Sequence, residues 1–71
     1  MEQWEHLLVQ VGRRGTGHQY LVQPPQPNLQ SDLRKIGSEN TVALLNELGR
    51  SGWHLAAVDS ATDSYWMRRR A

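Results

Sequence analysis

The chain has 71 residues, a formal net charge of +1 and no cysteine. A domain of this size buries only roughly 60 % of the surface of its unfolded chain. Without cysteine it has neither a disulfide framework nor a Cys-based zinc site. Its stability therefore has to come from tight packing or self-association. A charge this close to neutral excludes strong attraction of polyanions over the whole surface, so any nucleic-acid role of this single domain, residues 1–71, has to be local.

The first element expected is a strand at residues 3–11, QWEHLLVQV, which is rich in Trp, Leu and Val and contains no breaker. Alternation divides its apolar residues between two sides, with Trp4 and Leu8 on one side and Leu7, Val9 and Val11 on the other. Because both sides are apolar, the strand is expected to be buried on both.

A turn and a second strand are expected next. The segment GRRGTG, residues 12–17, supplies three glycines that tolerate positive φ, and a strand at 18–22 follows it. Proline donates no ladder hydrogen bond, so QPPQPN ends regular pairing. A long loop is therefore expected at residues 23–37, in which SDLRKI can form one helical turn.

A helix is expected after Ser38, whose hydroxyl would accept from an orphan backbone N–H, while Glu39 adds negative charge to the first turn. Apolar and small residues then recur at the three-and-four spacing of a buried stripe: Thr41, Leu44, Leu45 and Leu48. The pattern predicts an amphipathic helix that docks on a sheet.

The helix is expected to end in a Schellman motif, with Gly52 as the left-handed residue just past its last turn. Trp53 would then fold back onto Leu48, because a hydrophobic contact between these two positions accompanies that closure. Gly49, one turn earlier, is expected to allow a close approach to the sheet.

Two further strand-like runs, WHLAAVD at 53–59 and SYWMRRR at 64–70, flank a polar turn rich in Asp and Ser. Two strands, a helix and two more strands with short hairpin connections predict a two-layer α+β domain, in which one helix covers one face of a four-stranded antiparallel sheet. The second face is then either solvated or buried against another copy.

The chain resembles the small bacterial and phage domains grouped as domain-of-unknown-function family 4177. WEHLLVQV is similar to the opening strand of that family, with His6 where an aromatic is usual, and LLNELGRSGWHLAAV is similar to its helix-to-strand turn, with His54 where Glu is common. The closing YWMRRR fits as well, whereas the insertion at 12–37 departs from shorter members. The resemblance covers about half of the chain and implies a fold but no activity.

Few residues support catalysis or metal binding. The spacing of His6, His18 and His54 matches no compact ligand motif. Asp59 and Ser60 do not form a triad with His54, because neighbours on a strand point to opposite faces. DSATDS lacks the glycine and the glutamate of a calcium loop. We therefore expect no enzyme, no metal and no cofactor.

Two basic segments are candidates for binding a polyanion. In GRRGTG, glycine N–H groups beside Arg13 and Arg14 could cradle a phosphate, although a solvated hairpin tip explains the segment as well. In YWMRRR, alternation puts Trp66, Arg68 and Arg70 on one side and Arg69 on the other. Terminal charges that keep an edge strand soluble are the competing explanation.

The favoured function is a non-catalytic binding or interaction module that associates with itself or with another protein, and the alternative is a protein that binds nucleic acid or a phosphate ligand. The amino terminus shows neither a signal-peptide pattern nor a membrane span, so a cytoplasmic protein without membrane contact is expected.

A homodimer is the expected form of self-association. Its interface would be lined by Leu7, Val9 and Val11, or else by Trp4 and Leu8, depending on which side the helix takes. In the competing arrangement, the loop at 23–37 folds over the uncovered side as a lid and completes a monomeric core with Leu29, Leu33 and Ile36.

Overall fold

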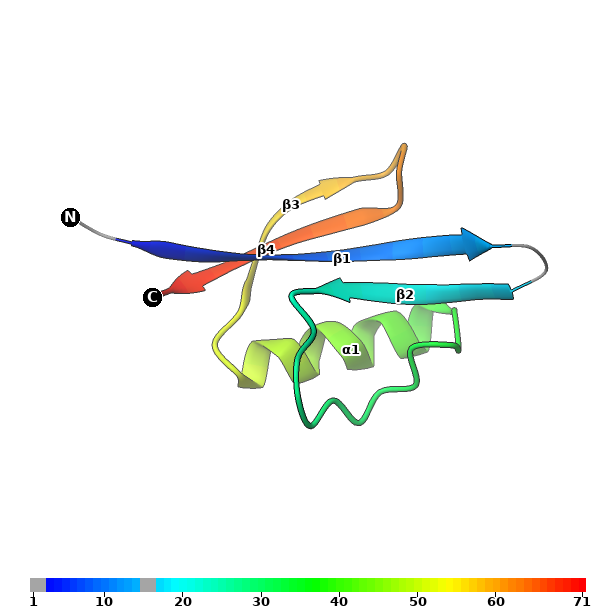
Figure 1. Cartoon of the computed structure of the whole chain (residues 1–71), viewed down its shortest axis with the longest axis horizontal. Coiled ribbons are helices and arrows are strands. Elements are labelled where there is room, and N and C mark those ends of the chain that lie inside the picture. The colour runs from blue at the N-terminus through cyan, green and yellow to red at the C-terminus, as the bar shows by residue number, and fades with distance from the viewer. Residues whose placement is uncertain (1–2, 15–16) are drawn as a thin grey trace.

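A computed structural model describes residues 3–14 and 17–71, and describes the backbone alone at positions 13, 14 and 17. The chain forms, in order, β1 (Trp4–Arg14), β2 (Gly17–Gln23), α1 (Ser38–Arg50), β3 (His54–Asp59) and β4 (Ser64–Arg70). The strands are antiparallel and lie in the order β2-β1-β4-β3 (Figure 1). The predicted α+β domain, with one helix and a four-stranded antiparallel sheet, is confirmed.

The helix covers the side of the sheet that carries Leu7 and Val9. These two residues are buried with Leu44 and Leu48 of α1, and Val11 packs against the same core. The buried apolar cluster consists of Leu7, Val9, Tyr20, Val22, Leu44, Leu48, Trp53 and Met67. Leu7 and Val9 therefore do not line a self-association surface, because α1 takes their side of the strand and buries them within one chain, and Val11 on the same side is partly buried.

The helix lies alongside β1 and β2, whereas β3 lies at the opposite side of the molecule (Figure 1). None of the residues of β3 is buried, although the strand contains Leu55 and Val58. A single helix of 13 residues thus covers only part of one sheet face.

The helix begins differently from the expectation. Ser38 is its first residue, the cap position is Gly37, and no side chain makes a capping hydrogen bond there. The Thr41 hydroxyl donates instead to the Gly37 carbonyl (2.8 Å). The prediction that the Ser38 hydroxyl caps the helix is therefore wrong.

The predicted helix exit is confirmed. Trp53 N–H donates to the Leu48 carbonyl (3.1 Å), and Gly52 N–H donates to the Gly49 carbonyl (3.0 Å), which is the pair of bonds that defines a Schellman motif. Gly52 has φ +94°, and both Trp53 and Leu48 are buried. A Cβ at Gly49 would meet no atom within 4 Å, so Gly49 does not provide a close approach to the sheet.

The loop between β2 and α1 completes the covered side of the sheet. Tyr20 N–H of β2 donates to the Leu33 carbonyl (2.6 Å), and Leu29 and Leu33 pack against the core. SDLRKI forms a single turn, closed by a bond from Lys35 N–H to the Asp32 carbonyl (3.1 Å). Because the loop joins the side that α1 already covers, it is not a lid over the other side, and Ile36 remains exposed.

Candidate functional site

The uncovered side of the sheet carries aromatic, basic and histidine side chains from three strands. We call it the open face. The strand register assigns to it Trp4, His6 and Leu8 of β1, Trp66, Arg68 and Arg70 of β4, and His54 of β3. Opposite residues of an antiparallel pair share a face, so these side chains form rows across the sheet.

Each row of the open face places unlike side chains next to one another. Trp4 lies opposite Arg70, and Leu8 lies opposite Trp66. Between these rows, His6 of β1 and His54 of β3 both lie opposite Arg68 of β4. The sequence distributes these residues over 67 positions, and only the pairing of β4 between β1 and β3 brings them together.

The Trp4 ring lies close to both arginines of the open face, Arg68 and Arg70. The Arg68 guanidinium lies 4.7 Å from the centroid of the Trp4 ring, and that of Arg70 lies 6.0 Å from the same centroid. A guanidinium over an aromatic face is attracted by the ring quadrupole and keeps the N–H donors at its edge available. Arg68 thus presents guanidinium donors of the kind that carboxylates and phosphates bind.

Large apolar side chains on the open face remain in contact with water. Trp4 is 40 % exposed and Trp66 is 44 % exposed. The row of His6 and Arg68 lies between the two tryptophans. Exposed aromatic side chains on one uncovered sheet face are typical of surfaces that bind another molecule, because their burial against it is favourable.

Arg69 does not belong to the open face, as alternation along the strand predicts. Its guanidinium lies 4.2 Å from the centroid of the Trp53 ring. It also donates to the Ser51 carbonyl (3.1 Å) and pairs with the Glu5 carboxylate (3.0 Å). These contacts tie the end of α1 to β1 and give Arg69 a structural role, while its inclusion among the polyanion-binding residues stays a prediction.

The basic turn lies largely outside the described residues. Residues 15 and 16 are not described, and the side chains of Arg13 and Arg14 are not described either. The backbone of both arginines continues β1 and pairs with His18 and Gly17 of β2, so the strands extend further into GRRGTG than its glycines predict.

The structure separates the histidines that a metal site would need. His6 and His54 flank Arg68, whereas His18 lies on β2 opposite Arg13. Within residues 3–14 and 17–71, no group of three or more His, Asp or Glu side chains is placed to hold a metal ion. The same part of the chain contains no helix long and apolar enough to cross a membrane.

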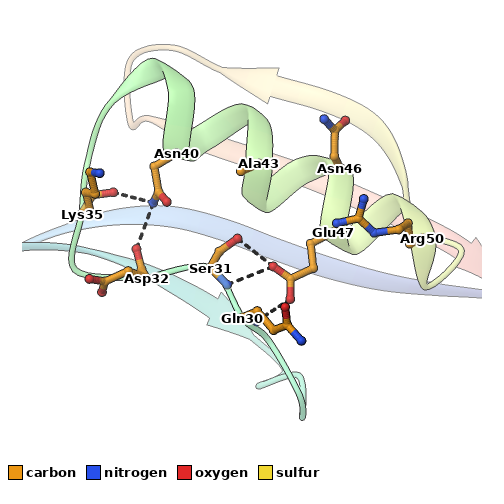
Figure 2. A pocket seen from close by; sticks show the side chains of 9 residues that line it. All are labelled: Gln30, Ser31, Asp32, Lys35, Asn40, Ala43, Asn46, Glu47 and Arg50. Carbon is orange, nitrogen blue, oxygen red and sulfur yellow. Dashed lines mark hydrogen bonds between the residues drawn. The ribbon is translucent and has the colours of Figure 1, made fainter.

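A polar hollow of about 640 Å³ lies between α1 and the loop before it (Figure 2). Its lining comprises Gln30, Ser31, Asp32, Lys35, Asn40, Ala43, Asn46, Glu47 and Arg50.

Glu47 of α1 uses its carboxylate to hold that loop. One oxygen accepts from Gln30 N–H, and the other accepts from the Ser31 N–H (3.0 Å) and hydroxyl (2.7 Å). The bonds from Gln30 and Ser31 lower the pKa of Glu47, since they stabilise the ionised form.

Asn40 makes a second link, in which its amide donates to the Asp32 carbonyl (2.9 Å) and to the Lys35 carbonyl, as Figure 2 shows. Glu47 and Asn40 thus use their side chains for hydrogen bonds to the loop. The hollow therefore lies where the loop is attached to α1, and its polar groups stabilise the fold. The open face is the stronger candidate for binding.

Sequence reasoning found Trp66, Arg68 and Arg70 as one strip but did not join Trp4, His6 and His54 to it. Alternation within a strand shows which of its own residues share a side. It does not show which side of a neighbouring strand lies beside them. Comparisons with protein-family models, with curated proteins and with solved structures find no match to this chain.

Proposed function

We propose that the chain is a non-catalytic binding module whose open face binds a short segment of single-stranded nucleic acid. The observation that carries this proposal is the arrangement of Trp4 and Trp66, both half-exposed on one uncovered sheet face, with two arginines over the Trp4 ring. Nucleic-acid binding, which the sequence offers as the alternative function, is the function that this arrangement favours.

The stacking surface is the Trp66 ring, because the Arg68 guanidinium already occupies a position over Trp4. Base stacking on an aromatic side chain stabilises a complex by about 1–3 kcal/mol per base and tolerates any base sequence. An antiparallel sheet with exposed aromatics is a rigid platform for unstacked bases. Leu8, opposite Trp66, extends the apolar surface under such a base.

The phosphate-binding groups are the guanidinium groups of Arg68 and Arg70. Both lie near the Trp4 ring, so less side-chain freedom is lost when they bind an anion. Among the described side chains of the open face the one carboxylate is that of Asp59, which lies at the opposite end of β4, beside Ser64. Arg68 and Arg70 thus lie away from that carboxylate, two and three rows along the sheet from it.

Fluorescence anisotropy with a labelled deoxythymidine oligonucleotide tests this proposal at several salt concentrations. Arg68→Gln should weaken binding and reduce the slope of log affinity against log salt by about 0.7, the share of one phosphate contact on a single strand. Arg50→Gln is the matched control, since Arg50 lies exposed on α1 and away from the open face.

Trp66→Ala should weaken oligonucleotide binding by about 1–3 kcal/mol but leave heparin binding unchanged, because heparin offers charge without bases. An oligonucleotide that does not bind at low salt, or one whose binding ignores both Arg68 and Trp66, would rule out this function.

A protein-interaction module remains the second candidate, and the bare side of β3 favours it. The homodimer expected from the sequence keeps Trp4 and Leu8 as possible contacts, since neither is buried. Membership of family 4177, a cytoplasmic location and the absence of catalysis are parts of the same proposal and stay predictions.

A further inference from the structure

The outer strand β3 is a six-residue strand without one buried residue. Leu55 is 51 % exposed and Val58 is 53 % exposed, and both lie on the helix side of the sheet, opposite Met67 and Tyr65 of β4. The helix does not reach them, because it lies at the other side of the molecule, next to β2 (Figure 1). An outer strand with exposed apolar residues and a free backbone edge is a template for another strand.

The two outer edges of the sheet differ in this respect. Along β2, the loop supplies a backbone partner, because Tyr20 N–H donates to the Leu33 carbonyl. Glu47 and Asn40 hold the same loop in place from α1. Along β3, no backbone hydrogen bond to a segment other than β4 occurs within the described part of the chain. One edge is thus occupied from within, and the other is available.

We infer that β3 pairs with β3 of a second copy of this chain, antiparallel and about a twofold axis perpendicular to the sheet. In the register that we propose, Leu55 lies opposite Val58 of the second copy, and His54 lies opposite Asp59 of the second copy. The two four-stranded sheets then form one continuous sheet. A twofold axis repeats each of these contacts, as a self-complementary interface requires.

The irregularity in β3 makes this register possible. The pairing with β4 shifts between Leu55 and Ala57, which leaves Ala56 as an extra residue. Residues 55 and 58 would point to opposite faces of a regular strand, but here both lie opposite helix-side residues of β4. For the same reason His54 and Asp59 both lie on the open face. Facing residues across the twofold axis therefore share a face.

Charge and apolar character match in this register. The ends of β3 carry a basic side chain, His54, and an acidic one, Asp59. The strand contains no Lys, Arg or Pro, the residues that commonly prevent an edge strand from pairing. On the helix side, Leu55 and Val58 of both copies come together and shield one another from water. Two copies thus cover the region that one helix leaves bare.

Sedimentation equilibrium over a range of micromolar loadings tests the pairing. The wild-type chain should show a concentration-dependent mass between one and two chains. Leu55→Lys should abolish the dimer without unfolding the monomer, because Leu55 is half-exposed in the single chain. Val42→Lys is the matched control, since Val42 is an exposed apolar residue of α1 that lies outside β3. A dimer that survives Leu55→Lys, or a mass of one chain at every loading, overturns the proposal.

Two further variants test the register without touching Asp59, which accepts a bond from Ala61 N–H in its own turn (3.0 Å). His54→Glu places like charges opposite each other twice, so the dimer should dissociate roughly 3–30-fold more readily, whereas His54→Lys should tighten it. Equal effects of the two variants overturn the proposed register. Pairing through β3 uses none of the residues varied in the oligonucleotide experiment, so either idea can fail without the other.

Discussion

At the scale of single residues, the end of α1 shows how far a local pattern determines structure. Leu48, Gly52 and Trp53 lie within six positions, and the hydrogen bonds that join them are the two bonds of a Schellman motif. Arg69 completes this corner from β4 by lying over the Trp53 ring and by donating to the Ser51 carbonyl.

Gly52→Ala should destabilise the chain by about 1 kcal/mol or more, because Gly52 has φ +94°, where a Cβ is unfavourable. The nearest atom to that Cβ is Arg69 Cδ at 4.0 Å, so the loss is conformational and not a clash. Gly49→Ala is the matched control and should stabilise by roughly 0.4–1 kcal/mol, since Gly49 is helical and unobstructed. Urea unfolding measures both effects. If the midpoint shifts in the same direction in both variants relative to the wild type, the assigned helix exit is contradicted.

Arg69→Gln should destabilise the chain by roughly 1 kcal/mol, because it removes the contact with Trp53 and the ion pair with Glu5. Arg68→Gln should change stability less, since its contact is with a half-exposed ring. Oligonucleotide binding should show the reverse order, with Arg68→Gln the more damaging. Urea unfolding and anisotropy on the same two variants measure both, and an identical order in both experiments would contradict the assignment of these arginines to opposite sides.

At the scale of elements, the structure depends on how the long loop is fastened. A loop of this length loses much conformational freedom on folding, and its polar backbone needs partners. Glu47 and Asn40, both on α1, supply several of them. Leu29 and Leu33 add apolar contacts, so the loop belongs to the core although it has no regular secondary structure.

Glu47→Gln should speed amide hydrogen exchange at Ser31, because an uncharged amide accepts the loop N–H bonds more weakly. Glu39→Gln is the control, since Glu39 lies exposed in the first helical turn. If the amide of Ser31 exchanges at the same rate in the wild type and in Glu47→Gln, the Glu47 carboxylate does not hold the loop.

The same bonds set a pH dependence. The folded-state pKa of Glu47 lies below its ordinary value of 4.5, so its contribution to stability is complete above that pH and is lost as the pH falls through the lower folded pKa. Stability curves of the wild type and of Glu47→Gln should therefore converge in acid. A difference between them that persists in strong acid would contradict this cause.

At the scale of the whole molecule, the three tryptophans lie on two sides of the sheet, and α1 covers only one of these sides. Trp53 is buried on the covered side, whereas Trp4 and Trp66 are half-exposed on the open face. Apolar side chains of the sheet are exposed on the open face, at Trp4 and Trp66, and along the outer strand β3, at Leu55 and Val58.

Fluorescence should separate these tryptophans. In the Trp4→Phe/Trp66→Phe variant, the remaining emission comes from Trp53, and it should be blue-shifted and protected from acrylamide, because Trp53 is enclosed by the core. In Trp53→Phe, the emission should be red-shifted and readily quenched. A freely quenched Trp53 would show that α1 does not cover that side.

The sequence by itself determined the features that depend on residues close together in the chain. These are the five elements in their order, the helix exit, the bounds 64–70 of the last strand and the alternation that places Trp66, Arg68 and Arg70 on one side. Hydrogen bonds within a few residues, and the two-residue period of a strand, suffice for each of these features.

Only the tertiary structure decided which side of β1 the helix takes, because Trp4 and Leu8 make one side as apolar as Leu7 and Val9 make the other. The open face followed from that choice and from the order of the strands. His6 and His54 reach Arg68 because β4 pairs between β1 and β3, and pairing over such separations follows from burial of the shared core.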